Sequence, residues 1–420
     1  RMITTMLLLG LGVAGFAQAP VAEEPVVEAP VAIHTAFKIR TITAGINVTQ
    51  ANYREELVEA MAFLEKAKAI TLREGFLKHG TRISTNPWPE YTEGLSLEGT
   101  VDMIADMVAM TRGEIRYGFA IGPGIVDDVY DIDIIQKILA FKDRRPNSTI
   151  VIATKENGIH YNAVRAAAKV IKGLSEIDVN FPGSFAAIAN TPSEVPFFPG
   201  AYHDRPYNSF TIGTQGASIF MDVSERVESI QEYEEALWEV YEREMKFLEK
   251  AAYKIEAETG WKFEGIDTTP AQMGEISIGK AVENLIGAPF GSPGTLAVCG
   301  IMTSVIKGID VKKCEGYLGL FLPTMEDRVL AERAYDYYGL DSLLAYSGVS
   351  GTGLDVVAIP GDVTLGQLEF ILLDIATMAL KLDKALTGRL YPIPGKKAGE
   401  IADLGKWTPQ KIFRVKAFRE

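Results

Sequence analysis

Strand-like and helix-like segments alternate along this chain from about residue 37, and this alternation restricts the possible folds more than any other feature. Residues 37–46 alternate apolar and polar side chains as a strand does, whereas residues 55–69 carry apolar side chains at helical spacing. The same change of period recurs along the chain and gives about ten strands separated by helices. Repeated units of this kind predict a single α/β domain over residues 36–420, with parallel strands and right-handed crossovers.

The other elements follow from the same two periods and from capping signals. Thr364 and Gln367 form a capping box ahead of the last long helix. Ser224 and Gly260 are residue types that begin and end helices, here a helix over about 224–259. We expect further strands at residues 81–85, 117–121, 148–153, 185–189, 210–212, 262–266, 317–322 and 354–359. We expect further helices at residues 101–110, 132–141, 161–174, 278–286, 295–307 and 326–337.

The first 35 residues have a different character. Residues 1–19 contain a charge, a short apolar run and then Ala17, Gln18 and Ala19, which is the order of a secretory signal peptide. Residues 20–35 are rich in proline and glutamate and indicate an extended linker. This layout predicts an exported protein, periplasmic or extracellular, with the N-terminus as a candidate membrane tether. The alternative is a buried hydrophobic segment in a cytoplasmic protein.

Charge and residue counts exclude several classes of partner and site. The net charge of −13 repels phosphate backbones, so we expect no nucleic acid partner. Four histidines in 420 residues are too few for a histidine-rich metal cluster. The two cysteines, Cys299 and Cys314, form either one bridge in an oxidising compartment or two unpaired thiols.

Carboxylates follow several of the predicted strands. Ligands of α/β folds bind beyond the carboxyl ends of the strands, and with parallel strands these loops would all project toward one rim. Asp267 ends one strand, and Asp355 and Asp362 flank another, so at most one of the latter two reaches a given ligand directly. For Asp267 and Asp362 the alternative is the stabilisation of a turn.

Cations and backbone N–H groups near these loops are candidates for binding an anion. Gly351 and Gly353 permit close approach of their N–H groups to an anion. Arg82 lies in a strand, where a buried arginine needs a carboxylate or an anionic ligand. Lys396 lies on a tight loop over residues 389–399. The alternative is that this loop is only a solvated surface turn. His203 stands in an aromatic, proline-rich loop and is a candidate catalytic group.

Several of these segments resemble a known family over roughly residues 38–399. The matching stretches are residues 39–43, 82–85, 197–203, 291–295, 319–327, 351–362 and 392–399, and the last two are the most specific. The chain resembles domain-of-unknown-function family 711, whose members are often labelled PFL-like after pyruvate formate-lyase. The resemblance implies a ten-stranded β/α barrel of the pyruvate formate-lyase type.

The resemblance does not carry over the glycyl-radical reaction. Glycyl-radical enzymes have a glycine loop near the C-terminus and a reactive cysteine in mid-chain. Here residues 413–420 contain no glycine, and Cys299 lies in an apolar helix. An exported protein would also expose such a radical to oxygen. We therefore expect a different chemistry.

These observations leave three hypotheses for the function. The first is an enzyme that acts on a small anionic metabolite, with Asp355, Asp362, Asp267 and His203 as catalytic groups. In this hypothesis Arg82, Gly351, Gly353 and Lys396 bind the substrate, and any metal held by the carboxylates would be Mg²⁺ or Ca²⁺. The second is an exported binding protein without turnover. The third is a structural or assembly protein, a homo-oligomer joined by its N-terminal arm.

Overall fold

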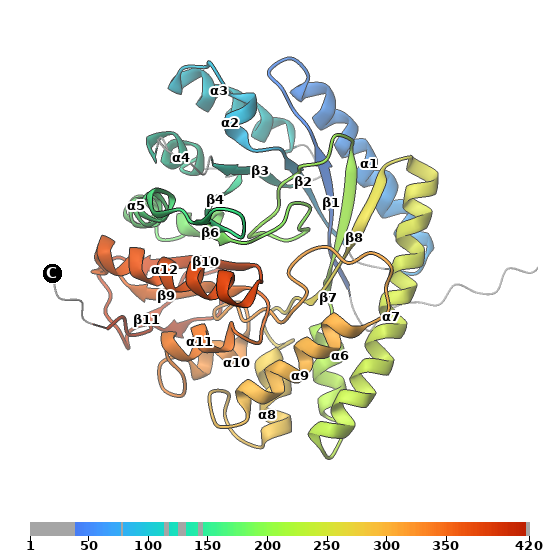
Figure 1. Cartoon of the computed structure of the whole chain (residues 1–420), viewed down its shortest axis with the longest axis vertical. Helices are drawn as coiled ribbons and strands as arrows, with labels where there is room; N and C mark the ends of the chain where they lie inside the picture. The colour runs from blue at the N-terminus through green and yellow to red at the C-terminus, as the bar shows by residue number, and fades with distance from the viewer. Residues whose placement is uncertain (1–37, 77–78, 113–116, 125–131, 142–145, 417–420) are drawn as a thin grey trace, which may run out of the picture.

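A computed structural model of the chain describes residues 38–76, 79–112, 117–124, 132–141 and 146–416. Its centre is a curled, ten-stranded sheet in the order β8, β7, β1, β2, β3, β4, β6, β10 and β9, with the short β5 paired to β4 (Figure 1). The nine strands of this path are β1 (Lys38–Ile46), β2 (His79–Thr85), β3 (Gly118–Gly124), β4 (Asn147–Thr154), β6 (Phe185–Ala189), β7 (Ser209–Gln215), β8 (Lys262–Pro270), β9 (Gly353–Pro360) and β10 (Leu386–Ile393). β5 is Gly158–Ile159, and β11 (Ile401–Ala402) and β12 (Gln410–Lys411) form a separate small sheet.

The sheet is mostly parallel, as the alternation predicts, but it reverses direction twice. The five central strands, β1, β2, β3, β4 and β6, are parallel to one another. On either side of them the direction reverses, because β7 pairs antiparallel with β1 and β10 pairs antiparallel with β6. The outer pairs β7–β8 and β9–β10 therefore run opposite to the five central strands. The expectation that all strands end at one rim is wrong, because the carboxyl ends of the outer and central strands lie at opposite edges.

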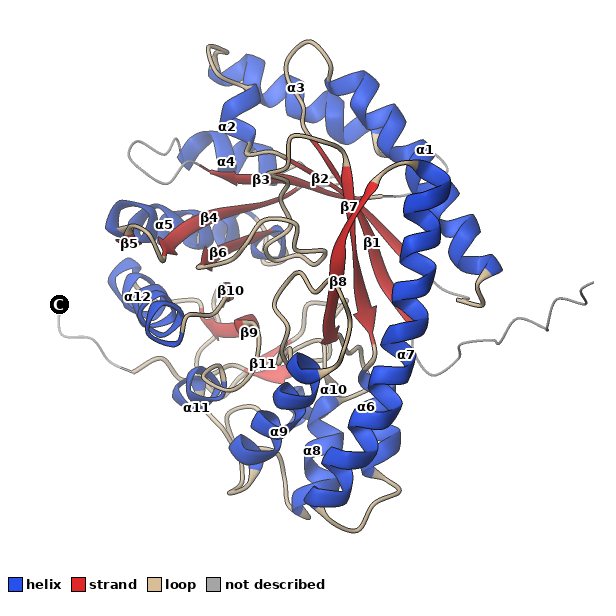
Figure 2. Cartoon of the chain, turned by 45° about the vertical axis from the view of Figure 1, so that its right-hand side comes forward, coloured by secondary structure: helices blue, strands red, loops and turns tan. Residues whose placement is uncertain are grey.

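Helices surround the sheet, which lies inside them (Figure 2). In the described part of the chain the helices are α1 (Tyr53–Arg73), α2 (Trp88–Tyr91), α3 (Leu97–Met110), α4 (Ile132–Leu139), α5 (Tyr161–Ile177), α6 (Ala217–Ser224), α7 (Ile230–Thr259), α8 (Ile278–Ile286), α9 (Thr295–Gly308), α10 (Arg328–Arg333), α11 (Leu340–Tyr346) and α12 (Leu365–Leu382). The apolar face of α12 packs on β10, β4 and β6, which explains the spacing of its leucines.

Capping residues set the helix ends. The capping box of Thr364 and Gln367 is present at the start of α12, and Gly260 ends α7 in the left-handed conformation, with φ 81°. The helix expected over 224–259 is present as α7, but it begins later, because Ser229 and not Ser224 is its N-cap. The Ser229 hydroxyl accepts a hydrogen bond from the N–H of Glu232, whereas Ser224 is the last residue of the shorter helix α6.

Residues 314–327 form an irregular segment that bridges the two edge strands, and we call it the crossing segment. At one end, the N–H of Glu315 donates to the Ile266 oxygen of β8 at 3.2 Å. Toward the other end, the N–H of Thr324 donates to the Asp355 oxygen of β9 at 3.1 Å. The strand expected at 317–322 is wrong, since these residues lie in the crossing segment and form no strand. The segment fills the space between β8 and β9 that a closing strand pair would occupy.

One further sequence expectation needs correction. Residues 389–399 are predicted to form one tight loop, but the first five of them belong to the buried strand β10. The expectation of an α/β fold with about ten strands is confirmed, since the central sheet has ten strands. Among the strand pairings of the described residues, the edge strands β8 and β9 are not joined to each other, and closure depends on which strands become neighbours and not on how many there are.

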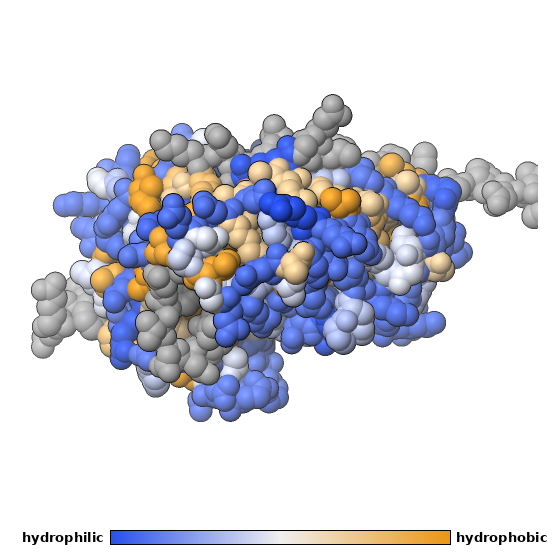
Figure 3. Space-filling model, turned by 90° about the horizontal axis from the view of Figure 1, so that it is seen from above, coloured by the Kyte–Doolittle hydropathy of each residue, from blue (hydrophilic) through white to orange (hydrophobic). Residues whose placement is uncertain are grey.

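The interior is a continuous apolar core between sheet and helices, and the surface is mainly hydrophilic. In the view of Figure 3, hydrophilic residues cover most of the face, with apolar residues between them. Cys299 is buried and Cys314 exposed, both as free thiols. None of the described helices has the length and apolar character needed to cross a membrane. The signal peptide and linker expected over residues 1–35 lie outside the described residues.

Candidate functional site

A cavity of about 280 Å³ opens near the amino ends of the central strands. Arg40 lies near the start of β1, Asn147 begins β4, and Ser184 directly precedes β6. The outer strands contribute Asp355 and Arg389. The remaining described residues of the lining are Arg82, Gly183, Phe197, Phe198, Ala271, Phe321, Glu326, Lys406 and Trp407. The site thus lies at the edge opposite to the one that strand direction predicts for a parallel sheet.

A buried ion pair joins the two outer strands at this cavity. Nε of Arg389 donates to Oδ1 of Asp355 at 2.6 Å, and an Nη atom of Arg389 donates to Oδ2 at 3.0 Å. The same arginine donates to Oε1 of Glu326 at 3.2 Å, and its guanidinium lies 5.6 Å from the centre of the Phe198 ring. Arg389 and Asp355 are both buried, so each neutralises a charge that would be costly alone. One guanidinium therefore holds two carboxylates at the wall of the cavity.

An irregularity in β9 directs Asp355 toward Arg389. Val356, the next residue, has φ 52°, a left-handed conformation that is strained for a β-branched side chain. Thr324 of the crossing segment holds this turn of the backbone, because its hydroxyl donates to the Val356 oxygen at 2.8 Å. The strand pairing of β9 with β10 shifts register at the same place. The crossing segment thus positions the ion pair.

Among the described residues, Arg82 has an amide partner and no carboxylate partner. It donates from Nη1 to the side-chain oxygen of Asn147 at 3.0 Å, and its Nε atom is buried without a hydrogen-bond partner in the described part of the chain. No carboxylate of the described residues pairs with Arg82 or with the exposed Arg40 beside it. Burial lowers the pKa of Arg82, and the neighbouring charges of Arg40 and Arg389 lower it further. An anion in the cavity would relieve this repulsion.

The charge of the cavity is opposite to that of the whole protein. Its described lining has four cationic side chains and two carboxylates, a surplus of two positive charges, in a chain of net charge −13. The wall also contains four aromatic side chains, two of which, Phe197 and Phe321, are in edge contact with ring centres 5.1 Å apart. Such a site can bind the charged end of a small anion and pack its uncharged part against rings.

The structure brings only two of the predicted site residues, Arg82 and Asp355, into this cavity. Asp267 is fully buried elsewhere and accepts hydrogen bonds from the N–H groups of Thr269, Tyr317 and Leu318. Burial raises the pKa of Asp267, while these hydrogen bonds oppose the rise. Its carboxylate holds the start of the crossing segment against β8.

His203 lies at the opposite edge of the sheet. Its N–H donates to the Thr85 oxygen at the end of β2, and its ring packs against Gly45 near the end of β1. The ring atom Nδ1 is 2.9 Å from Oε1 of Glu194, whose other oxygen accepts a hydrogen bond from Ser209 at 2.8 Å. His203 is completely buried, so this cluster joins the 190–208 loop to the sheet.

The two predicted glycines serve close packing of the backbone. The N–H of Gly351 already donates to the Leu320 oxygen at 2.6 Å, and a Cβ atom on Gly351 would lie 2.8 Å from the carbonyl carbon of Gly319. Gly353 has φ 87°, and a Cβ there would lie 2.6 Å from the Thr387 oxygen. Both glycines are buried, which leaves their surroundings no room for an anion.

Lys396 and Asp362 lie on neighbouring turns beyond β10 and β9. The N–H of Gly361 donates to the Lys396 oxygen at 3.0 Å, so the two most specific family stretches meet here. Both side chains are exposed and neither lines the cavity.

Sequence reasoning missed Arg389 and Glu326 as site residues. Arg389 was read as part of a loop because Gly388 and Pro392 interrupt its strand, although Leu386, Leu390 and Ile393 are apolar. Glu326 lies in the stretch 319–327 that carries the family resemblance, and this was the available signal.

The three predicted carboxylates do not come together at one point. Mg²⁺ and Ca²⁺ need several oxygen ligands on one ion. Both oxygens of Asp355 accept hydrogen bonds from Arg389, and Asp267 and Asp362 lie outside the cavity. Among the described residues, no group of three or more His, Cys, Asp or Glu side chains could hold a metal ion.

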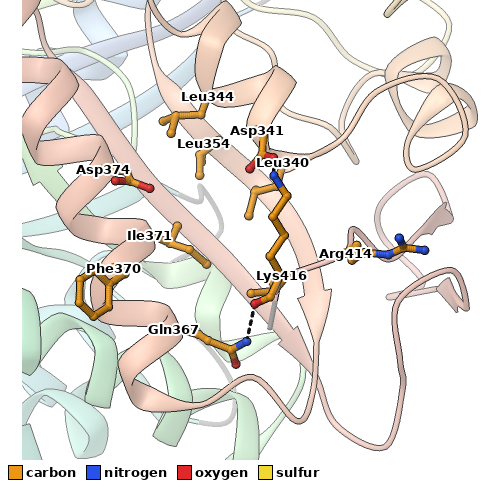
Figure 4. A pocket seen from close by; sticks show the side chains of 11 residues that line it. Leu340, Asp341, Leu344, Leu354, Gln367, Phe370, Ile371, Asp374, Arg414 and Lys416 are labelled. Atoms are coloured by element: carbon orange, nitrogen blue, oxygen red, sulfur yellow. Dashed lines mark hydrogen bonds and ion pairs between the residues drawn. The ribbon is translucent and has the colours of Figure 1, made fainter. Parts of the chain in front are cut away.

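A second hollow, of about 320 Å³, lies between α11, α12 and residues 414–416 (Figure 4). Several of its polar groups bind one another, since Lys416 pairs with Asp341 and Gln367 donates to the Lys416 oxygen at 2.9 Å. The rest of the wall is mainly apolar, with Phe370 and Ile371 of α12 among its side chains. The first cavity is the better candidate, because the buried Nε atom of Arg82 there has no hydrogen-bond partner among the described residues.

Comparison with known proteins finds one family and relatives that share one family name. The model of the family described as Uncharacterised ACR (DUF711) matches residues 32–405. The UPF0210 protein of Pyrobaculum islandicum is 28% identical over 326 residues, which cover 75% of this chain and 70% of that protein. The UPF0210 protein of Pyrobaculum aerophilum is 31% identical over 264 residues, which cover 60% of this chain and 58% of that protein. The UPF0210 protein of Carboxydothermus hydrogenoformans is 26% identical over 410 residues, which cover 87% of this chain and 88% of that protein. Since the family model matches most of the chain, the resemblance seen in its sequence is confirmed, and the chain belongs to the DUF711 family.

Proposed function

We propose that this protein is an enzyme that acts on a small anionic metabolite bound between Arg40, Arg82 and Arg389, without glycyl-radical chemistry. One observation carries the proposal: Arg82 keeps a buried Nε without a partner in a cavity where, among the described residues, no carboxylate pairs with it. A guanidinium withdrawn from water without a counter-ion costs stability, and a bound carboxylate or phosphate oxygen would offset that cost.

The size and walls of the cavity support a small ligand. The volume of about 280 Å³ is just below the roughly 300–1,000 Å³ of sites for drug-sized molecules. The anionic group would lie on Arg82 and Arg40, and its uncharged part would contact Phe198 and Phe321. Asp355 would act indirectly, because it fixes the guanidinium of Arg389 at the wall.

We further propose that the curled sheet and the crossing segment enclose this cavity as the wall of a barrel does. The hydrogen bonds of the crossing segment to both β8 and β9 support this arrangement. Neither cysteine lines the cavity, and burial raises the pKa of the Cys299 thiol to about 12, which disfavours a thiolate there. Export of the protein stays a prediction from its sequence.

Calorimetric titration with sulfate, inorganic phosphate and malonate tests the proposal. We expect saturable binding of at least one of these anions. Arg82→Gln should weaken it about tenfold or more, because hydrogen bonds to a charged group are lost. Arg226→Gln, which changes an exposed arginine outside the cavity, is the matched control and should bind as the wild type does.

The outcomes separate the hypotheses. Absence of binding to all three anions, or equal binding by Arg82→Gln and the wild type, would overturn the proposed site. Specific binding with no turnover of any bound organic acid would favour a binding protein on the same scaffold and overturn the enzyme.

A further inference from the structure

We infer that Glu326 is the proton-transfer group of this cavity: it takes up one proton when an anion enters and presents the resulting O–H group to the bound molecule. This inference rests on the proposed anion site. It adds a reaction class, acid or base catalysis by a carboxyl group, to the binding that the arginines would provide.

The two carboxylates at Arg389 are held unequally. Asp355 receives two hydrogen bonds, at 2.6 and 3.0 Å, and both of its oxygens are used. Glu326 receives one hydrogen bond from Arg389, at 3.2 Å, on Oε1 alone. Within the described residues Oε2 of Glu326 has no hydrogen-bond partner. Asp355 is therefore fixed as the counter-ion of Arg389, whereas Glu326 keeps one oxygen that can carry a proton.

Position adds to this difference. Glu326 lines the cavity from the crossing segment, directly before Asp327, which caps α10. The backbone oxygen of Glu326 accepts a hydrogen bond from the N–H of Gly274 at 2.7 Å, which fixes the main chain while the side chain extends into the site. A carboxyl on a fixed backbone at the wall of an anion site is placed to exchange a proton with the ligand.

The charges around Glu326 set the direction of proton uptake. Burial raises the pKa of Glu326, and the neighbouring Asp355 raises it too, while Arg389 and Arg40 lower it. Arg82 and Lys406 also line the cavity. The buried Tyr391 hydroxyl interacts electrostatically with Arg389, Glu326 and Asp355. An anion bound on Arg40 and Arg82 would cancel part of the cationic field that keeps Glu326 ionised. The negative charge of the anion would also repel the Glu326 carboxylate. Glu326 therefore loses its proton more easily in the empty site than in the occupied one.

Proton balance is simple in this scheme. The ionised Glu326 and the free anion combine with one proton from solvent, and the product is the neutral carboxylic acid beside the bound anion. Since protons are taken up, binding must weaken as the pH rises wherever Glu326 is ionised in the empty site. The limit is a tenfold loss of affinity per pH unit for one proton.

Calorimetry of the full chain with sulfate measures this uptake. Sulfate stays a dianion from about pH 6 to about pH 8, so any proton taken up comes to the protein. Titrations in buffers with different ionisation enthalpies give the number of protons bound per sulfate. We expect the wild type to take up a measurable fraction of one proton and to bind sulfate more weakly at about pH 8 than at about pH 6.

Two glutamine variants locate the proton. Glu326→Gln resembles the protonated acid, so it should bind sulfate with no proton uptake and with an affinity nearly independent of pH. At about pH 8 it should bind at least as tightly as the wild type. Glu332→Gln, on an exposed glutamate of α10 paired with Arg328, is the matched control and should keep the wild-type proton uptake.

The failures are distinguishable. If the wild type binds sulfate, Arg82→Gln weakens it, and no proton is taken up, the anion site stands and the role of Glu326 is overturned. The same holds if Glu326→Gln keeps the wild-type proton uptake. If no anion binds, the proposed site and this inference fall together.

Discussion

Arg389 of β10 and Asp355 of β9 form a buried, two-bonded ion pair on neighbouring strands, at 2.6 and 3.0 Å. Neither residue belongs to the carboxyl-end rim where α/β enzymes ordinarily bind ligands. Both lie at an edge strand pair that runs against the central five strands, and the strained Val356 helps to direct Asp355 inward. The pair therefore has two roles: it joins β9 to β10, and it contributes one positive and one negative charge to the wall of the cavity.

Asp355→Asn should lower the free energy of unfolding by about 3 kcal/mol. The substitution leaves the buried Arg389 guanidinium with only the single, longer hydrogen bond to the Glu326 carboxylate, and breaking a buried pair from one side typically costs that much. Urea unfolding followed by circular dichroism measures it. Asp362→Asn, on the exposed turn at the other end of β9, should stay within about 0.5 kcal/mol of the wild type. Equal loss in both variants would contradict the importance of the pair.

Gly351→Ala should destabilise the protein by about 2 kcal/mol. The new Cβ would lie 2.8 Å from backbone atoms of Gly319, and two backbones cannot separate without loss of the hydrogen bond from Gly351 to Leu320. The melting temperature measures the effect. Gly300→Ala in α9 meets nothing closer than 3.9 Å and should be neutral or slightly stabilising. A neutral Gly351→Ala would mean that the crossing segment does not pack as described.

Local elements of the fold could be predicted well, because their signals are local. The strand 185–189 and the helix 278–286 have the predicted bounds, and the Thr364 capping box is present. Residues 317–322 of the crossing segment have the apolar side chains of a strand, and the structure buries Tyr317, Leu320 and Leu322 as a strand would. Their burial comes from the space between two distant strands, which no local period encodes.

The site could be predicted only in part for the same reason. Arg82 was recognisable, since an arginine in a strand needs a partner wherever it is buried. Asp355 was named as a catalytic group, but its partner Arg389 is 34 residues away and was read as part of a loop. The two reversals of strand direction moved the candidate cavity to the edge opposite the expected rim. Strand direction is set by tertiary pairing, and alternation of strands and helices does not determine it.

Glu315 should give the stability of the protein a measurable pH dependence. Burial raises its pKa from 4.5 to about 7; Glu194, Glu264 and Asp267 add to the rise, and Arg205 opposes it. Between these values the folded chain keeps a proton that the unfolded chain has lost, so stability should fall as the pH rises from about 4.5 to about 7.

Glu315→Gln removes this titration and should flatten the stability curve by about 1 kcal/mol over that range, a value reduced for the partial exposure of the side chain. Urea unfolding at several pH values measures both curves. Glu332→Gln, an exposed glutamate, should keep the wild-type slope. If the free energy of unfolding of Glu315→Gln changes with pH as that of the wild type does, the Glu315 carboxyl ionises with the same pKa in the folded and unfolded chains, which would contradict the prediction.

Arg40→Gln and Lys396→Gln distinguish the cavity from the turn at Lys396, another candidate for anion binding in the sequence. Arg40 lines the cavity beside Arg82, whereas Lys396 is exposed on the turn beyond β10. Loss of an exposed guanidinium at a binding site should weaken sulfate binding about threefold to tenfold, because its hydrogen bonds compete with water. Lys396→Gln removes the same unit of charge from the protein but no contact in the cavity, so its affinity should equal that of the wild type. Both are measured by calorimetric titration at one ionic strength, since distant charges act through a screened field. If Lys396→Gln were the weaker binder, the anion would belong at the 361–396 turns, and the cavity would lose its assignment.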